Sequence, residues 1–291
     1  MSYLIPIVVG MLMVSIGMSL RLKELGSTIG RLTWLAWARL LLATFVIPAA
    51  LALVLAQVFR LERSALAGVF MVGVAPGAPL LTRNLARKGF DMHLAATYQL
   101  WAALMIPIMI PLLVLGAGLL YNRVIWIPAR VLLWQIVEKQ LLPLALGIAL
   151  ARAAPNFSKR AQPPLNVLGN LLLTVFIVLA LFKLGPELKA ITPLLPVVCL
   201  LLALGCILAV WVVRLKDPVV VKTFAISNTN RHVGLALLLS GQYLHAVRAI
   251  PAIACYALAA PVVMIVYAWW SRRGGRTRSA EAEAGERLIS G

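Results

Sequence analysis

Stretches of about 20 mostly apolar residues recur along this chain from residue 3 to residue 270, with no polar domain between them. An α-helix rises about 1.5 Å per residue, so about 20 residues cross the roughly 30 Å hydrocarbon core of a bilayer. By this criterion the sequence predicts about nine transmembrane helices. They are expected at residues 3–20, 34–58, 65–86, 93–120, 126–150, 164–184, 191–213, 219–243 and 248–271.

The composition agrees with a membrane protein. Of the 291 residues, 62% are hydrophobic and 12% are charged, whereas soluble domains have about 25% charged residues. We therefore expect an all-α membrane protein with one polytopic domain at 1–271, whose halves are roughly 1–120 and 126–271. Apolar periodicity ends at Arg272, so residues 272–291 are predicted to form a disordered cytoplasmic tail.

The net charge of +18 does not indicate nucleic-acid binding, because the basic residues fall in small groups between apolar runs. Lys and Arg concentrate in one alternate set of loops, which predicts an outside amino terminus and an inside carboxyl terminus. A compact chain with no evident secretory signal favours a bacterial inner membrane. The oligomeric state is open.

The sequence does not favour an enzyme. It contains no HExxH or GxSxG motif and no cluster of carboxylates for acid–base chemistry. Its three cysteines lie in apolar runs without metal-ligand spacing, so we predict no metal site, no cofactor and no catalytic residue. A channel is less favoured, because no filter repeat or ring of charge is evident.

Two of the predicted spans are interrupted. The third contains Val74-Ala75-Pro76-Gly77-Ala78-Pro79, where two prolines remove backbone donors and Gly77 permits unusual dihedral angles. We expect an unwound stretch here, and a simple proline kink is the alternative. The eighth contains the polar run at 227–232, which lipid would not tolerate. An extramembrane loop between two short helices is the alternative there.

Broken helices in matching positions of two halves are typical of inverted-repeat secondary transporters. The two interruptions lie about half the chain apart. The amino ends of broken helices offer unpaired N–H groups to an anion, and opened carbonyls can coordinate a cation. The sequence therefore predicts an inverted repeat whose two broken helices carry the site.

The chain resembles the bile acid:sodium symporter family. The resemblance rests on Gly17-Met18-Ser19-Leu20, the Pro76-Gly77 break, Leu142-Pro143 with Gly147, and Gly234-Leu235-Ala236. It implies a core domain and a panel domain, two broken helices that cross beside the sites, and transport of organic anions by alternating access.

The chain departs from the family at the positions that the resemblance assigns to sodium. Leu81 and Thr82 stand where the family has a Ser-Asn pair, and Ser227 and Arg231 stand where it has an acidic residue and a Gln. Replacing a carboxylate by a hydroxyl and adding a guanidinium removes both ligands and negative charge. Sodium coupling is therefore doubtful, and proton coupling is the alternative.

We accordingly predict a transporter of a small organic anion. Arg231 and the amino ends of the broken helices would attract its carboxylate or sulfonate. A sodium-coupled symporter of the bile acid type is the alternative. The residues expected at the substrate or ion site are Pro76, Gly77, Thr82, Ser227, Asn228, Asn230, Arg231 and His232.

Four polar residues within spans could add coupling or cavity functions. Glu138 could neutralise Arg231 or carry a proton, although a local pair with Lys139 is equally expected. His232 could titrate near neutral pH or be structural. Thr97 and Gln99 could line the cavity or bond between helices.

Overall fold

The computed structural model describes residues 4–19, 33–77, 92–120, 129–183, 193–215, 217–243 and 249–289. Within these ranges every element is helical and no strand occurs. The helices are α1 (Leu4–Ser19), α3 (Trp34–Leu41), the π-helix η1 (Leu42–Val46), α4 (Ile47–Val58), α5 (Arg63–Val74), α7 (Met92–Leu120), α8 (Ala129–Ile136), the π-helix η3 (Val137–Leu141), α9 (Leu142–Ala153), α10 (Pro155–Lys183), α12 (Leu195–Val212), α13 (Pro218–Thr229), α14 (Val233–Tyr243) and α15 (Ile250–Ile289).

Helices occur at each predicted span. Four of those in the described ranges are long and apolar enough to cross a bilayer: Trp34–Val58, Trp101–Leu120, Leu195–Val212 and Ile250–Ser271. Their outward faces carry exposed apolar side chains such as Leu112, Leu208 and Ile265, which lipid would cover. The prediction of an all-helical membrane protein is thus confirmed, while the count of nine spans and the inverted repeat stay predictions.

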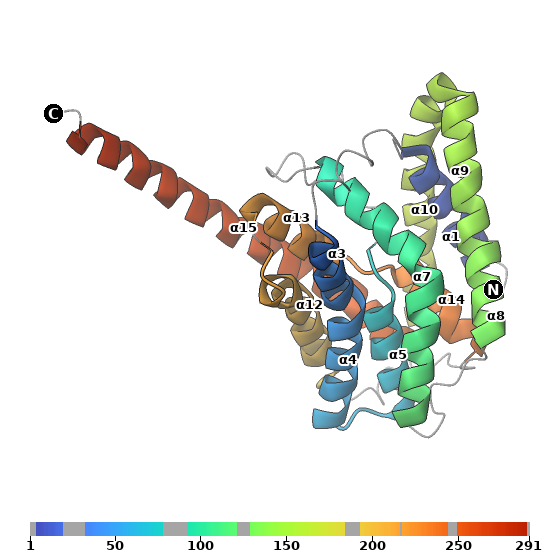
Figure 1. Ribbon diagram of the computed structural model, residues 1–291. Coiled ribbons are helices and arrows are strands. Elements are labelled where there is room, and N and C mark those ends of the chain that lie inside the picture. Colours follow the sequence, from blue (N-terminus) through green and yellow to red (C-terminus); the bar gives the residue numbers. More distant parts are fainter. Residues whose placement is uncertain are drawn as a thin grey trace.

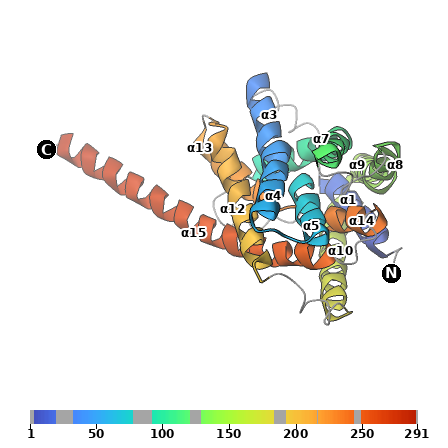
Figure 2. The ribbon, with the colours of Figure 1, turned by 90° about the horizontal axis from the view of Figure 1, so that it is seen from below.

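The helices form two groups. Helix α1 packs mainly against α9 and α10, and these lie on one side of the molecule in both ribbon views (Figures 1 and 2). Helices α4, α5, α12, α13 and α15 pack against one another in the second group, with α7 and α14 beside them. The two groups meet where α1 contacts α14 and where α10 contacts α15.

A glycine pair brings α1 and α9 close together. A Cβ added to Gly17 would collide with the carbonyl oxygen of Leu144 and would lie 2.8 Å from the Cα of Gly147. A Cβ added to Gly147 would likewise collide with the carbonyl oxygen of Val14. Small residues allow helix backbones to approach in membranes, so this contact explains why Gly17 and Gly147 belong to the motifs noted in the sequence.

Helix α15 includes the carboxyl-terminal segment. Residues 272–289 belong to α15, and this part extends away from the helix bundle (Figure 1). The disordered cytoplasmic tail stays a prediction. Ala, Glu and Arg, which are frequent in this segment, are strong helix formers. Local propensity therefore continues a helix here even though the apolar pattern has ended.

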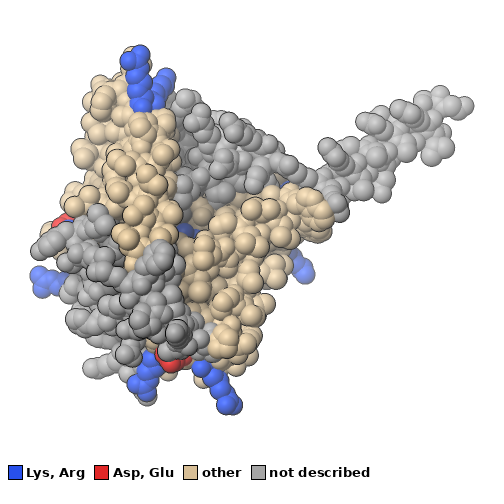
Figure 3. Space-filling model, turned by 180° about the vertical axis from the view of Figure 1, so that it is seen from behind, with Lys and Arg blue, Asp and Glu red and all other residues tan. Residues whose placement is uncertain are grey.

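The described surface is mostly uncharged. In Figure 3 the Lys and Arg side chains form a few projecting groups, and broad uncharged areas lie between them. This distribution suits a protein whose sides face hydrocarbon and whose charges reach the headgroups or water.

Candidate functional site

The first predicted break is present. Helix α5 ends at Val74, and Ala75 is in the extended region with φ −91° and ψ 94°. Pro76 is buried, and Gly77 has a positive φ of 30°, which only glycine adopts readily. The helix therefore ends here, and the alternative of a kinked but continuous helix is wrong.

The second predicted break is also present. Helix α13 ends at Thr229 and α14 begins at Val233, so three residues separate the two half-helices. The side chains of Ser227, Asn228, Thr229, Arg231 and His232 are at most 2% exposed. The polar run is therefore enclosed by the protein and does not face lipid.

The two breaks touch each other. The backbone N–H of His232 donates a hydrogen bond of 3.2 Å to the carbonyl oxygen of Ala75. Helix α14 also packs against α5. Two interruptions about half the chain apart in sequence are therefore joined in one place, as the paired pattern predicted.

Two backbone carbonyls of the Trp34–Val58 helix lack a partner within that helix and accept hydrogen bonds from the second break instead. In the π-helix η1 the N–H of Ile47 bonds to Leu42 instead of to Ala43, which leaves the Ala43 carbonyl without its α-helical partner. Pro48 lacks the N–H that would bond to Thr44. Asn228 Nδ2 donates to the Ala43 carbonyl at 3.0 Å, and Arg231 Nη1 donates to the Thr44 carbonyl at 2.7 Å.

The other side-chain hydrogen bond of Arg231 within the described residues is with a thiol. Its Nη2 donates to the Sγ of Cys206 at 3.4 Å, and its Nε has no hydrogen-bond partner. In the described ranges no carboxylate forms a salt bridge with it. Arginine stays protonated in proteins, so the break holds a buried positive charge whose hydrogen-bond acceptors are a carbonyl and a thiol.

Two tyrosines complete the network. Tyr98 on α7 places its hydroxyl 3.0 Å from Thr44 Oγ1 and 2.9 Å from Asn228 Oδ1. Tyr256 on α15 donates to the carbonyl of Thr229 at 2.7 Å. This carbonyl lies where α13 ends and also accepts from the Arg231 N–H at 3.0 Å. Side chains from α7 and α15 therefore satisfy polar groups that the breaks expose.

Replacing Tyr98 with Phe is expected to lower stability. It leaves Asn228 Oδ1 buried without its donor, which costs about 1–3 kcal/mol, and the melting temperature in detergent should fall. Tyr267→Phe is the matched control, because Tyr267 accepts a single bond of 3.2 Å from Trp211 Nε1 and should cost less. Equal losses in the two variants would contradict a special role for the Tyr98 network.

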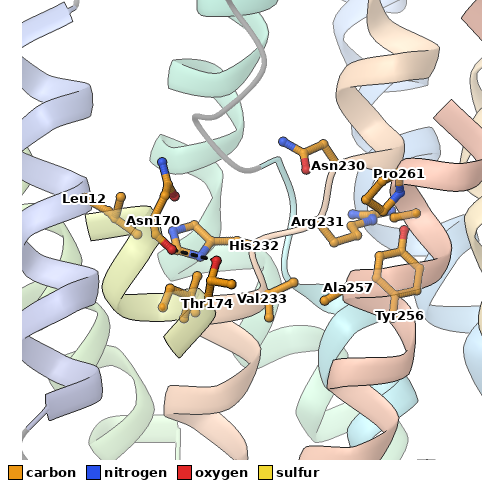
Figure 4. A pocket seen from close by; sticks show the side chains of 13 residues that line it. Leu12, Asn170, Thr174, Asn230, Arg231, His232, Val233, Tyr256, Ala257 and Pro261 are labelled. Carbon is orange, nitrogen blue, oxygen red and sulfur yellow. Dashed lines mark hydrogen bonds between the residues drawn. The ribbon is translucent and has the colours of Figure 1, made fainter. Parts of the chain in front are cut away.

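A cavity of about 190 Å³ lies beside the second break. Leu12 of α1 and Asn170, Leu173 and Thr174 of α10 line one side of it. The other side consists of Asn230, Arg231, His232, Val233 and Gly234 from the break and of Tyr256, Ala257, Ala260 and Pro261 from α15. The cavity therefore lies between the two helix groups, and Figure 4 shows it from close by.

Unpartnered polar atoms occur on both of its sides. His232 Nδ1 accepts a hydrogen bond of 3.0 Å from the N–H of Leu235 and so caps α14. A neutral histidine whose Nδ1 accepts carries its proton on Nε2, and this Nε2 has no partner. Asn170 Nδ2 donates to Asn166, whereas Asn170 Oδ1 has no partner.

The other predicted site residues lie elsewhere. Ser227 donates within its own helix to Thr223. Glu138 pairs with Lys139 on η3, and the Glu138 side chain is 43% exposed. The expectation that Glu138 reaches Arg231 is therefore not met, because Glu138 faces outward. Thr97 is buried on α7 next to Tyr98, outside the described cavity lining. Thr82 and the side chain of Gln99 lie outside the described residues.

Several residues of this site are absent from the sequence prediction. The network residues Tyr98 and Tyr256 and the cavity residues Asn170 and Thr174 are the main ones. One signal was available, since Asn166, Asn170 and Thr174 follow at intervals of four and so share one face of the mostly apolar stretch predicted at 164–184. The tyrosines give no comparable signal, because an aromatic residue in a span usually packs against apolar neighbours or lipid.

Several oxygen atoms at the breaks already accept hydrogen bonds. The carbonyls of Thr44, Thr229 and Ala75 accept from Arg231, Tyr256 and the His232 N–H, respectively. Asn228 Oδ1 accepts from Tyr98. A hard cation needs several free oxygen ligands, and a fixed guanidinium beside it would repel it. The sequence-based doubt about sodium coupling stays a prediction.

Apolar helices that are interrupted at a buried polar centre are typical of membrane transporters. The sequence model of the Sodium Bile acid symporter family matches residues 6–191, and the chain belongs to this family. It is accordingly an integral membrane protein of the bile acid/sodium symporter kind. The match ends before α12 and so covers the first break but not the second. No curated protein matches the sequence.

Proposed function

We propose that this protein is a secondary transporter that moves a small organic anion across the membrane by alternating access, independently of a sodium gradient. The observation that carries the proposal is Arg231. It is 1% exposed, forms no salt bridge in the described ranges, and lines a cavity.

An anion would complete the electrostatics of this site. A buried charge without a counter-ion is unfavourable, and a carboxylate or sulfonate in the cavity would offset the guanidinium. The unpartnered Nε of Arg231 provides an N–H donor for such a group. Asn230, the neighbouring residue at the break, lines the same cavity and supplies a further amide.

The position of the cavity supports alternating access. It lies between α1 and α10 on one side and the break with α15 on the other, which belong to different helix groups. Relative movement of two helix groups around a fixed site is the general mechanism of such transporters. A substrate held at Arg231 would face each side of the membrane in turn.

The proposal is tested by uptake of labelled small carboxylates and sulfonates into proteoliposomes. A sodium gradient, a proton gradient and no gradient are imposed in turn. We expect the initial rate and the final level to be the same with and without a sodium gradient. Accumulation driven by protons would assign coupling to His232 or Glu138.

Two outcomes would overturn the proposal. Sodium-driven accumulation would favour a sodium-coupled symporter of the bile acid type, with ion ligands elsewhere in the chain. Flux far above carrier turnover, measured as single-channel conductance in planar bilayers, would indicate a channel.

A further inference from the structure

Asn170 and His232 face each other from different helix groups. Figure 4 shows their side chains turned toward one another at one end of the cavity, and Arg231, Tyr256 and Pro261 at the other end. Asn170 belongs to α10, and His232 belongs to the break between α13 and α14. The cavity therefore has two chemically different ends.

The two facing atoms are complementary. The bond from the Leu235 N–H fixes His232 with a proton on Nε2, so Nε2 is a donor. The bond from Asn170 Nδ2 to the Asn166 carbonyl fixes the amide with Oδ1 turned away from it, so Oδ1 is an acceptor. Both atoms are buried and lack a hydrogen bond, although buried polar groups nearly always have one.

We propose that this pair binds a hydroxyl group of the substrate, so that the transported anion is a small hydroxycarboxylate. A hydroxyl both accepts and donates, so one oxygen can accept from His232 Nε2 and donate to Asn170 Oδ1. A keto group would leave Asn170 without a donor, and an ammonium group would leave His232 without an acceptor. The inference rests on the proposed function, which places the carboxylate at Arg231.

The size of the cavity limits the substrate. An apolar cavity of about 150 Å³ holds benzene, and pockets for drug-sized ligands have about 300–1,000 Å³. The cavity of about 190 Å³ therefore suits a carboxylate of a few carbon atoms. The hydroxyl would reach the pair when α10 and the break move apart, as alternating access requires.

The test compares compounds that differ in one group. Uptake of butanoate, 2-oxobutanoate and 2-, 3- and 4-hydroxybutanoate into proteoliposomes is measured over a range of concentrations. At least one hydroxybutanoate is expected to half-saturate uptake at a concentration about tenfold or more below that of butanoate, because its hydroxyl satisfies two buried groups. The half-saturating concentration of 2-oxobutanoate should lie closer to that of butanoate than the value for that hydroxybutanoate does.

Two variants locate the effect. Asn170→Leu removes the acceptor. His232→Asn removes the imidazole Nε2 donor, and its shorter side chain retains an oxygen that can cap α14. In each variant, the half-saturating concentration of butanoate divided by that of the hydroxybutanoate should fall toward one. A purely structural role would weaken both compounds equally and leave this ratio unchanged, which would overturn the inference. Gln57→Leu, an amide removed at an exposed end of α4, is the control and should retain the wild-type ratio.

The outcomes separate the inference from the proposed function. If butanoate and the hydroxybutanoates enter equally well and Arg231→Ala stops both, the hydroxyl site is wrong and the anion site stands. If no carboxylate enters, or if Arg231→Ala leaves uptake unchanged, both are wrong.

Discussion

Replacement of Arg231 by Ala is expected to abolish uptake of the organic anion while the protein still reaches the membrane. The guanidinium is the buried charge that we propose binds the carboxylate, and its Nε is free for this contact. A hydrogen bond to a charged group contributes about 1.5–3 kcal/mol. The loss of two such bonds would therefore lower the affinity for the anion by a factor of about a hundred or more. The measurement is uptake into proteoliposomes, normalised to the amount of inserted protein.

Two further variants control for charge and for folding. Arg231→Lys keeps the charge but lacks the planar fork, so it should retain part of the uptake at a higher half-saturating concentration. Arg130→Gln removes an exposed arginine of α8 and should leave uptake unaltered. Normal uptake by Arg231→Ala would remove the basis for an anion site at the break.

The second large effect is expected at the contact of α1 with α9. Gly17→Leu or Gly147→Leu would force apart two helix backbones that almost touch. Overpacking a core costs about 1–3 kcal/mol, and a whole isobutyl group between two backbones should exceed this range. We expect little folded protein after solubilisation, measured as the monodisperse fraction in size-exclusion chromatography and as the melting temperature.

Gly116 provides the matched control. It lies within α7, and a Cβ added there would meet no atom within 4 Å. Leucine has a higher helix propensity than glycine by about 0.8 kcal/mol, so Gly116→Leu should keep or raise stability. Equal damage from Gly116→Leu and Gly17→Leu would show that glycine substitution itself, and not the close contact, causes the loss.

The helices and their two breaks could be predicted from the sequence because both depend on local composition. Runs of apolar residues give the spans, and prolines or a polar run within them give the breaks at Ala75 and Asn230. The tail could not be predicted in the same way. Its sequence has no apolar periodicity, so only the helix propensity of its residues favours the helical form.

The site could be predicted only where a residue is exceptional in its own segment. Arg231 and His232 are conspicuous in an apolar span, so the sequence marks them directly. Tyr98, Tyr256 and Asn170 contribute because of how α7, α15 and α10 pack around the break, and this depends on tertiary structure. Glu138 is equally conspicuous but faces outward beside Lys139, since the sequence does not fix the rotation of a helix that is apolar on all sides.

The contact of Arg231 with the Thr44 carbonyl, in place of a carboxylate, has an electrical consequence. A carbonyl is a dipole and does not cancel the charge, so the proposed empty carrier keeps one positive charge at its site, while the carrier loaded with a monovalent anion is neutral there. Moving one elementary charge through a full potential of 100 mV changes the free energy by about 2.3 kcal/mol. The membrane voltage would therefore act on the return of the empty carrier and not on the loaded step, so the resting potential would set the direction in which the transporter turns over most readily.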